Sequence, residues 1–78
     1  MKYAIHPGET LQEVMNDRNL SAEKLAQKMG IVHERLLDLL EGNVDLNSQL
    51  CHQLERGTNI PATFWMNLHN QYVEDRFK

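Results

Sequence analysis

Five side chains in this 78-residue sequence are of types that bind transition metals: His6, His33, Cys51, His52 and His69. Zinc sites in proteins usually take their ligands in pairs, spaced as C-x₂₋₄-C or H-x₃₋₅-H. The sequence contains no such pair, and the adjacent Cys51 and His52 would point about 100° apart on a helix. The spacing therefore argues against a metal site, and we expect no bound cofactor.

Catalytic chemistry has no stronger signal. The sequence contains no nucleophile elbow, no glycine-rich phosphate-binding loop and no pair of carboxylates within an apolar motif. His6 directly precedes Pro7 at a predicted helix start, which favours a capping role over acid–base catalysis. Cys51 is interpreted as a small core residue, because free cysteine is among the most buried residue types. We therefore do not expect an enzyme.

Residues 30–43, GIVHERLLDLLEGN, are predicted to form a short amphipathic helix between two glycine turns. Its outward side chains are of types that contact base edges: a carboxylate can accept from cytosine N4, a histidine can donate to guanine, and a leucine can touch a thymine methyl. The same helix is acidic, with Glu34, Asp38 and Glu41 against Arg35. Carboxylates close to DNA phosphates cost affinity. The layout therefore favours DNA reading while the charge opposes it.

The length and the net charge of the sequence indicate one small acidic domain. A chain of 78 residues with a net charge of -3 has room for one core, and its charge neither excludes nor favours nucleic acid. Cys51 is the only cysteine, so an intrachain disulfide is impossible and a cytoplasmic protein is expected. No apolar run approaches the roughly 20 residues of a membrane span, so no membrane contact is expected.

Apolar residues recur at helical spacing and no segment alternates with a period of two, so the predicted fold is all-α. Capping residues divide the chain into five helices. The first begins at Pro7 and fades near residues 17–19, and the second runs from the N-cap Ser21 to Gly30. The third begins after Ile31 and Val32 and ends at Gly42. The fourth runs from the N-cap Asn47 to Gly57, and the fifth begins at Pro61.

Three motifs resemble one family over nearly the whole chain. LSAEKLAQKMGI, residues 20–31, with a second glycine at position 42, resembles the helix-turn-helix of Xre/Cro-type repressors. HPGETL at residues 6–11 and IPATFWMNLHNQY at 60–72 resemble the opening and closing motifs of HigA-type antitoxins. The resemblance implies a compact five-helix domain over residues 1–78. Its helix-turn-helix would cover about 21–41, and its C-terminal helix, about 61–74, would serve core and dimer contacts.

The resemblance also implies a function. Members of the family are small antitoxins that neutralise a partner toxin, commonly a ribosome-dependent mRNA-cleaving protein, and that dimerise to repress their shared promoter. This sequence departs from its relatives in having no lysine after Gly42, where they commonly carry basic residues. Two alternatives stay open: a helix-turn-helix scaffold that binds protein with little or no DNA binding, and a plain Xre-type regulator without a toxin.

Site residues follow from the resemblance by position. The third helix would enter the major groove, with base contacts from His33, Glu34, Leu37 and Asp38. Phosphate contacts would come from Ser21, Ala22, Arg35, Asn43 and Asn47. On the last helix, Phe64 and Leu68 are expected in the core, Trp65 and Tyr72 nearer a dimer interface, and Phe77 is a candidate anchor for the tail. A surface ion pair between Arg35 and Asp38 is the plain structural alternative to a DNA role for these two.

Overall fold

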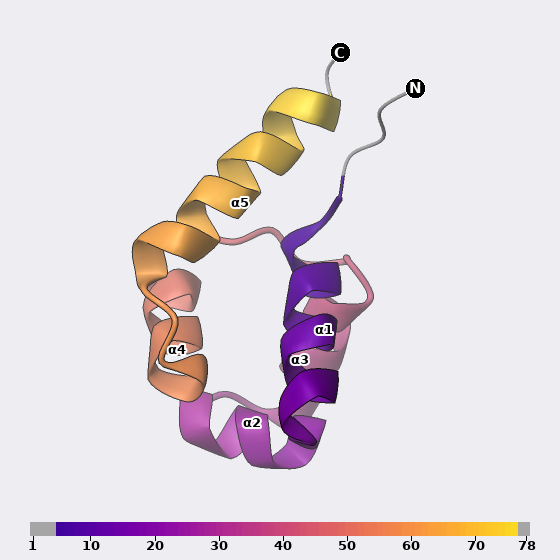
Figure 1. Cartoon of the computed structure of the whole chain (residues 1–78), viewed down its shortest axis with the longest axis vertical. Coiled ribbons are helices and arrows are strands. Elements are labelled where there is room, and N and C mark those ends of the chain that lie inside the picture. Colours follow the sequence, from indigo (N-terminus) through magenta and orange to yellow (C-terminus); the bar gives the residue numbers. More distant parts are fainter. Residues whose placement is uncertain (1–4, 77–78) are drawn as a thin grey trace.

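The computed structural model describes residues 5–76, which form five helices and no strand. The helices are α1 (Pro7–Arg18), α2 (Ala22–Met29), α3 (His33–Leu40), α4 (Ser48–Thr58) and α5 (Ala62–Arg76). Helix α2 lies across the end of the molecule opposite α5, and α3 follows it behind α1 (Figure 1). The all-α prediction with five helices is confirmed. Phe77 lies outside the described residues.

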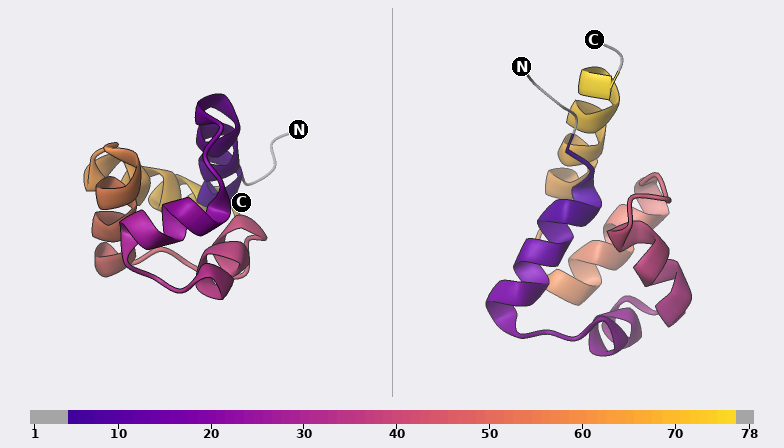
Figure 2. Two further views of the ribbon diagram at one scale, coloured as in Figure 1. Left: turned by 90° about the horizontal axis from the view of Figure 1, so that it is seen from below. Right: turned by 90° about the vertical axis from the view of Figure 1, so that its right-hand side faces the viewer.

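The core forms where the helices cross. Helix α2 packs against α3 and α4, and α4 packs against α5, while α1 lies against α3 and α5 (Figure 2). Burying one large aliphatic side chain contributes about 1.5–3 kcal/mol, so these contacts dominate the stability of so short a chain. The buried apolar residues are Leu11, Met15, Leu25, Ala26, Met29, Leu36, Leu39, Leu46, Leu50, Cys51, Leu54 and Trp65.

Helix starts follow the predicted caps at three positions. At α1, the Nδ1 atom of His6 accepts a hydrogen bond from the Gly8 N–H at 2.9 Å. At α2, the Ser21 hydroxyl accepts one from the Lys24 N–H at 3.2 Å. At α4, the Asn47 side-chain oxygen accepts one from the Leu50 N–H at 2.8 Å. Each bond satisfies a backbone donor that has no partner inside its own helix. The predicted starts of α1, α2 and α4 are therefore confirmed.

The predicted end of α4 at Gly57 is wrong. Gly57 lies inside α4, which continues to Thr58 and ends at Asn59 in the left-handed conformation, φ 63°. A Cβ at position 57 would lie 2.6 Å from Met29 Cγ and 2.8 Å from Leu25 Cδ1. The glycine is therefore explained by the close approach of α2 and α4, and the sequence alone cannot distinguish that use from a helix stop.

The prediction for α5 exchanged two aromatic residues. Trp65 has no accessible surface, whereas Phe64 is 41% exposed. The two rings are in edge contact, with their centroids 5.4 Å apart. Successive helical residues point about 100° apart, and the inward face is centred one position later than expected. A side chain without accessible surface cannot contact a second protomer. The prediction that Trp65 lies at a dimer interface is therefore wrong, as is the placement of Phe64 in the core.

Candidate nucleic-acid interface

Helices α2 and α3 are joined by a tight turn that sets the direction of α3. Gly30 takes the left-handed conformation at φ 76°, and its N–H and that of Ile31 bond the last carbonyls of α2. A left-handed residue is least costly as glycine, which explains the residue at this position. Leu36 and Leu39 then anchor α3 in the core, so the opposite side of the helix must face outward.

That outward side carries all the predicted base-contacting residues. Leu37 is 41% exposed, although leucines elsewhere on α3 are buried or half-buried. With it the helix presents one apolar, one imidazole and two carboxylate side chains, types that match thymine methyl, guanine and cytosine edges. The structure thus brings these four together on one exposed helix surface: His33, Glu34, Leu37 and Asp38.

The N-terminal end of α3 differs from those of α1, α2 and α4. Val32 occupies the cap position, is 68% exposed, and offers no side-chain acceptor to the first N–H groups. Free N–H groups and the helix dipole make such an end electrostatically positive. Sequence reasoning placed the start of α3 correctly but overlooked this consequence of a valine at the cap.

Beside this end lies a hollow of about 320 Å³. It brings together two of the predicted phosphate-contacting residues, Arg35 from α3 and Asn47 from the start of α4, and two glutamines that sequence reasoning missed. The missed signal was the spacing of Gln49 and Gln53, which places both on one side of α4. The lining residues are Gly30, Ile31, Val32, Arg35, Asn47, Gln49, Leu50 and Gln53.

The other predicted phosphate-contacting residues lie outside the hollow. Ser21 is exposed at the start of α2 with its hydroxyl committed as a cap, and Ala22 beside it is half-buried. Asn43 is exposed after α3, and its amide donates to Glu41 Oε2 at 3.4 Å. The structure therefore does not gather the five residues into a single cluster.

Arg35 does not pair with Asp38. Among residues 5–76 its guanidinium has no ion-pair or hydrogen-bond partner, so the expected surface pair is not formed. An unpaired exposed guanidinium has no ion pair to break and is available to an anion. Within the acidic outer face of α3, this cation is oriented toward the hollow at the side of the helix.

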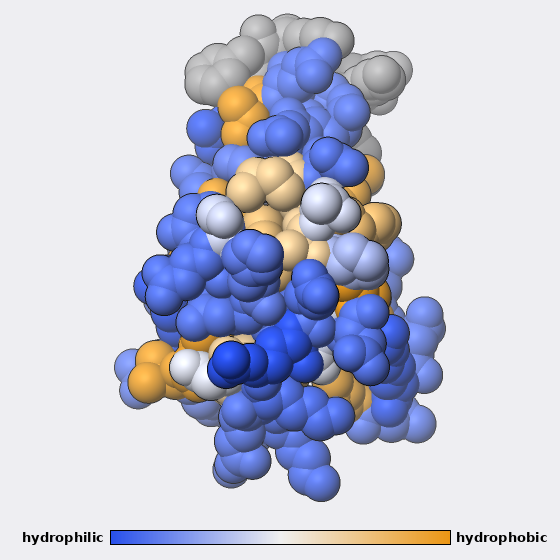
Figure 3. Space-filling view, turned by 90° about the vertical axis from the view of Figure 1, so that its left-hand side faces the viewer, coloured by the Kyte–Doolittle hydropathy of each residue, from blue (hydrophilic) through white to orange (hydrophobic). Residues whose placement is uncertain are grey.

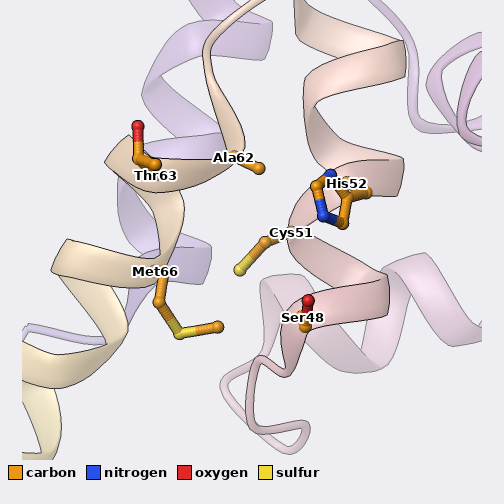
Figure 4. Close-up of a pocket in the computed structure, with 6 residues that line it drawn as sticks. All are labelled: Ser48, Cys51, His52, Ala62, Thr63 and Met66. Carbon is orange, nitrogen blue, oxygen red and sulfur yellow. The ribbon is translucent and has the colours of Figure 1, made fainter.

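A second surface feature lies between α4 and α5, where an apolar patch is surrounded by hydrophilic residues (Figure 3). A hollow of about 190 Å³ opens there, and Cys51 and Met66 point toward one another across it (Figure 4). Burial raises the pKa of the Cys51 thiol, which keeps it protonated and makes it a poor nucleophile and metal ligand. The remaining lining residues are Ser48, His52, Ala62 and Thr63.

The candidate metal ligands of the sequence are not brought together. Within residues 5–76, no three His, Cys, Asp or Glu side chains cluster in a way that could hold a metal ion. His6 is engaged structurally instead, since its Nε2 bonds the Val44 carbonyl at 2.9 Å while Nδ1 caps α1. In the same part of the chain, no helix combines the length and apolarity needed to cross a membrane.

Comparison with known proteins gives one consistent group of relatives. The chain is 30% identical over 74 residues to YddM of Escherichia coli K12, an uncharacterized helix-turn-helix-type transcriptional regulator, covering 92% of this chain and 79% of YddM. It superposes with a TM-score of 0.83 on the Pseudomonas aeruginosa antitoxin HigA, solved with the higBA promoter, at 28% identity over 91% of this chain and 78% of HigA.

A Coxiella burnetii addiction module antidote protein of the HigA family is equally similar. Its TM-score is 0.84 at 28% identity, covering 95% of this chain and 82% of the antidote protein. No family model matches the sequence. The relatives nevertheless agree with one another and span most of the chain.

Proposed function

This chain belongs to the helix-turn-helix transcriptional regulators of the HigA antitoxin type, and on that premise we propose that it binds operator DNA through α3 and neutralises a partner toxin. One observation carries the DNA-binding part. The exposed side chains of α3 lie beside an uncapped helix end and Arg35, which has no partner among the described residues, so the groups proposed to contact bases and phosphates share one surface. Support from similarity comes from HigA, whose structure was solved with promoter DNA. Because operator DNA lies in the cytoplasm of a bacterial cell, we propose that the protein works there.

In the proposed mechanism, phosphate contacts position α3 and its outward side chains read the bases. Arg35, Asn47 and the free N–H groups at the start of α3 hold the backbone, whereas Leu37 and its neighbours enter the major groove. Few cations are available, because the domain carries 8 Lys and Arg against 11 Asp and Glu. We therefore expect log affinity to fall only shallowly with log salt concentration.

The experiment that tests DNA binding is selection from a pool of random duplexes by the purified protein at low salt. A repressor with two-fold symmetry should recover a palindromic motif whose half-sites lie about one helical turn apart. Recovery of no motif would move the weight to the alternative in which α3 contacts only protein. That alternative is favoured by the exposed carboxylates of Glu34, Asp38 and Glu41, which would suit a basic partner.

We also propose that the protein dimerises, because a palindromic operator has two half-sites that would each bind one copy of the protein. With Trp65 buried, we propose that the contact is made along α5 by Phe64 and by the half-buried Tyr72. Sedimentation equilibrium of Phe64→Glu should give a monomer, while Asn70→Glu on exposed surface of the same helix should leave the oligomeric state unchanged. A Phe64→Glu protein that still dimerises would exclude this contact.

Antitoxin activity is proposed from the relatives, which are named as antitoxins or antidotes. The partner is expected to be a small basic protein encoded beside this one, since the exposed face of α3 is acidic. Co-expression should rescue cells from growth arrest by the neighbouring gene product and should recover both proteins as one complex. Growth arrest that persists at equal expression would leave a regulator without a toxin.

A further inference from the structure

Two hollows adjoin along one side of α4. The hollow beside α3 shares Gln49 and Gln53 with a second hollow of about 290 Å³, which is also lined by His52 and Arg56. Positions 49, 53 and 56 are spaced four and three residues apart, so they form one stripe on the helix. We call Gln49, Gln53 and Arg56 the α4 track.

The charge of this stripe is unlike that of the domain. The protein has 11 Asp and Glu residues, yet among the described residues none lines either hollow. The track offers amide donors with an arginine at its far end, and Arg35 stands at its near end. An anion bound along the path of the α4 track would meet amide N–H donors and guanidinium groups, and no carboxylate of the described residues would face it.

Arg56 belongs to this path by its position. A Cβ added to Gly30 would lie 3.4 Å from Arg56 Nη1, so the guanidinium lies over the turn between α2 and α3 that lines the first hollow. Within residues 5–76 the Arg56 guanidinium has no ion-pair or hydrogen-bond partner, whereas Arg18 donates to the Thr58 carbonyl at 2.6 Å. Arg35 and Arg56, each without a partner among the described residues, thus lie toward opposite ends of the two adjoining hollows.

We propose that the α4 track contacts the phosphate backbone of DNA beside the groove that α3 enters, and that it fixes the register of α3. This inference rests on the proposed function. The stripe is about 10 Å long, enough for roughly three nucleotides of one strand by axial rise. A duplex suits it better than a protein partner, because Arg35 of α3 lines the adjoining hollow and, among the residues that the structure describes, no Phe, Trp or Tyr lines either hollow.

The test compares three variants that each change the net charge by the same single unit. Gln53→Glu and Arg56→Gln alter the track, and Gln12→Glu, on exposed surface of α1, controls for total charge. Affinity is measured by fluorescence anisotropy for the duplex recovered in the selection, over a range of salt concentrations. Each track variant should weaken binding by about fivefold to tenfold. Arg56→Gln should also reduce the salt slope by about 0.9, because one cationic phosphate contact is lost, whereas Gln53→Glu weakens binding by placing a carboxylate against the phosphate.

A second measurement separates contact from an indirect structural effect. Neutral methylphosphonates are placed one at a time along the duplex backbone, and the loss of affinity is measured for each protein. At one phosphate on each half-site, the substitution should cost the wild type about fivefold to tenfold and should cost Arg56→Gln nothing further. A misfolded variant would be weakened at every position alike, and circular dichroism checks the helix content independently.

The outcomes separate the two proposals. A wild type that recovers and binds no duplex overturns the proposed function and this inference with it. A wild type that binds, with track variants indistinguishable from Gln12→Glu in affinity and salt slope, overturns the inference alone. The inference is also overturned if, at every phosphate, the methylphosphonate costs Arg56→Gln as much affinity as it costs the wild type.

Discussion

The starts of α1 and α3 differ in burial and in capping: the first is buried and capped, and the second is exposed and has no side-chain cap. At α1, His6, Pro7 and Gly8 are buried, and both ring nitrogens of His6 are hydrogen-bonded, one to Gly8 and one to the Val44 carbonyl. At α3, Val32 is exposed and no side chain caps the first N–H groups. The difference shows that hydrogen bonds within the domain hold the start of α1, whereas no side chain caps the first N–H groups of α3.

The α1 start is the more sensitive of the two to substitution. A Cβ at Gly8 would collide with the Leu39 carbonyl oxygen, a backbone atom that cannot rotate away. Gly8→Ala should therefore force α1 away from α3 and cost about 3 kcal/mol of unfolding free energy. Urea denaturation measures this, with Glu13→Ala on exposed surface of α1 as the control. A loss below about 1 kcal/mol would show that the crossing of α1 and α3 is easily adjusted.

His6 should show the next largest effect. His6→Ala removes the cap of α1 and the bond to Val44, and it opens space beside the Tyr72 ring, whose centroid lies 4.9 Å from that of His6. We expect a loss of about 2 kcal/mol in the same denaturation experiment.

His6→Asn is the matched comparison, since asparagine is a good N-cap but too short to keep the longer contact. It should lose about half as much as His6→Ala. Equal losses for the two variants would mean that capping contributes little, and that the bridge to Val44 and Tyr72 carries the whole effect.

At the α3 start the sign should reverse. Val32→Ser supplies the missing cap, so it should stabilise the protein by about 0.5–1 kcal/mol relative to Val32→Ala, which adds no acceptor. If the open N–H groups hold a phosphate, the same substitution should weaken DNA binding, because the hydroxyl competes for them. Thermal unfolding and anisotropy measure the two effects. A Val32→Ser protein no more stable than Val32→Ala would contradict an uncapped helix.

The smallest effect concerns Cys51, a scaffold residue. Burial raises the pKa of its thiol in the folded protein above the value in the unfolded chain. Above about pH 8.5 the unfolded chain therefore loses this proton first, and stability falls as the pH rises toward the folded pKa. Comparing wild type with Cys51→Ala by urea denaturation at pH 7 and pH 10 should show a slightly larger alkaline loss in the wild type. An equal loss in both would mean that the thiol does not contribute.

Much of the fold could be predicted because its signals are local. A cap bonds residues two or three positions away, and helical spacing alone selects which leucines turn inward, so the starts of α1, α2 and α4 were correct. Gly57 was misread because a helix stop and a close approach of two helices require the same residue. Phe64 and Trp65 were exchanged because a rotation of 100° about α5 is set by α4 and α1, which lie far away in sequence.

The sequence by itself determined the helices, their order and the exposed residues of α3, since these depend on spacing within each segment. Only the tertiary structure decided where polar groups from different helices meet. His6 is hydrogen-bonded to the Val44 carbonyl, 38 positions away along the chain. Among the described residues Arg35 forms no ion pair with Asp38, and the Arg56 guanidinium lies over the turn at Gly30. Such contacts depend on the packing of α1 and α2 against α3 and of α2 against α4, which no periodicity along the chain encodes.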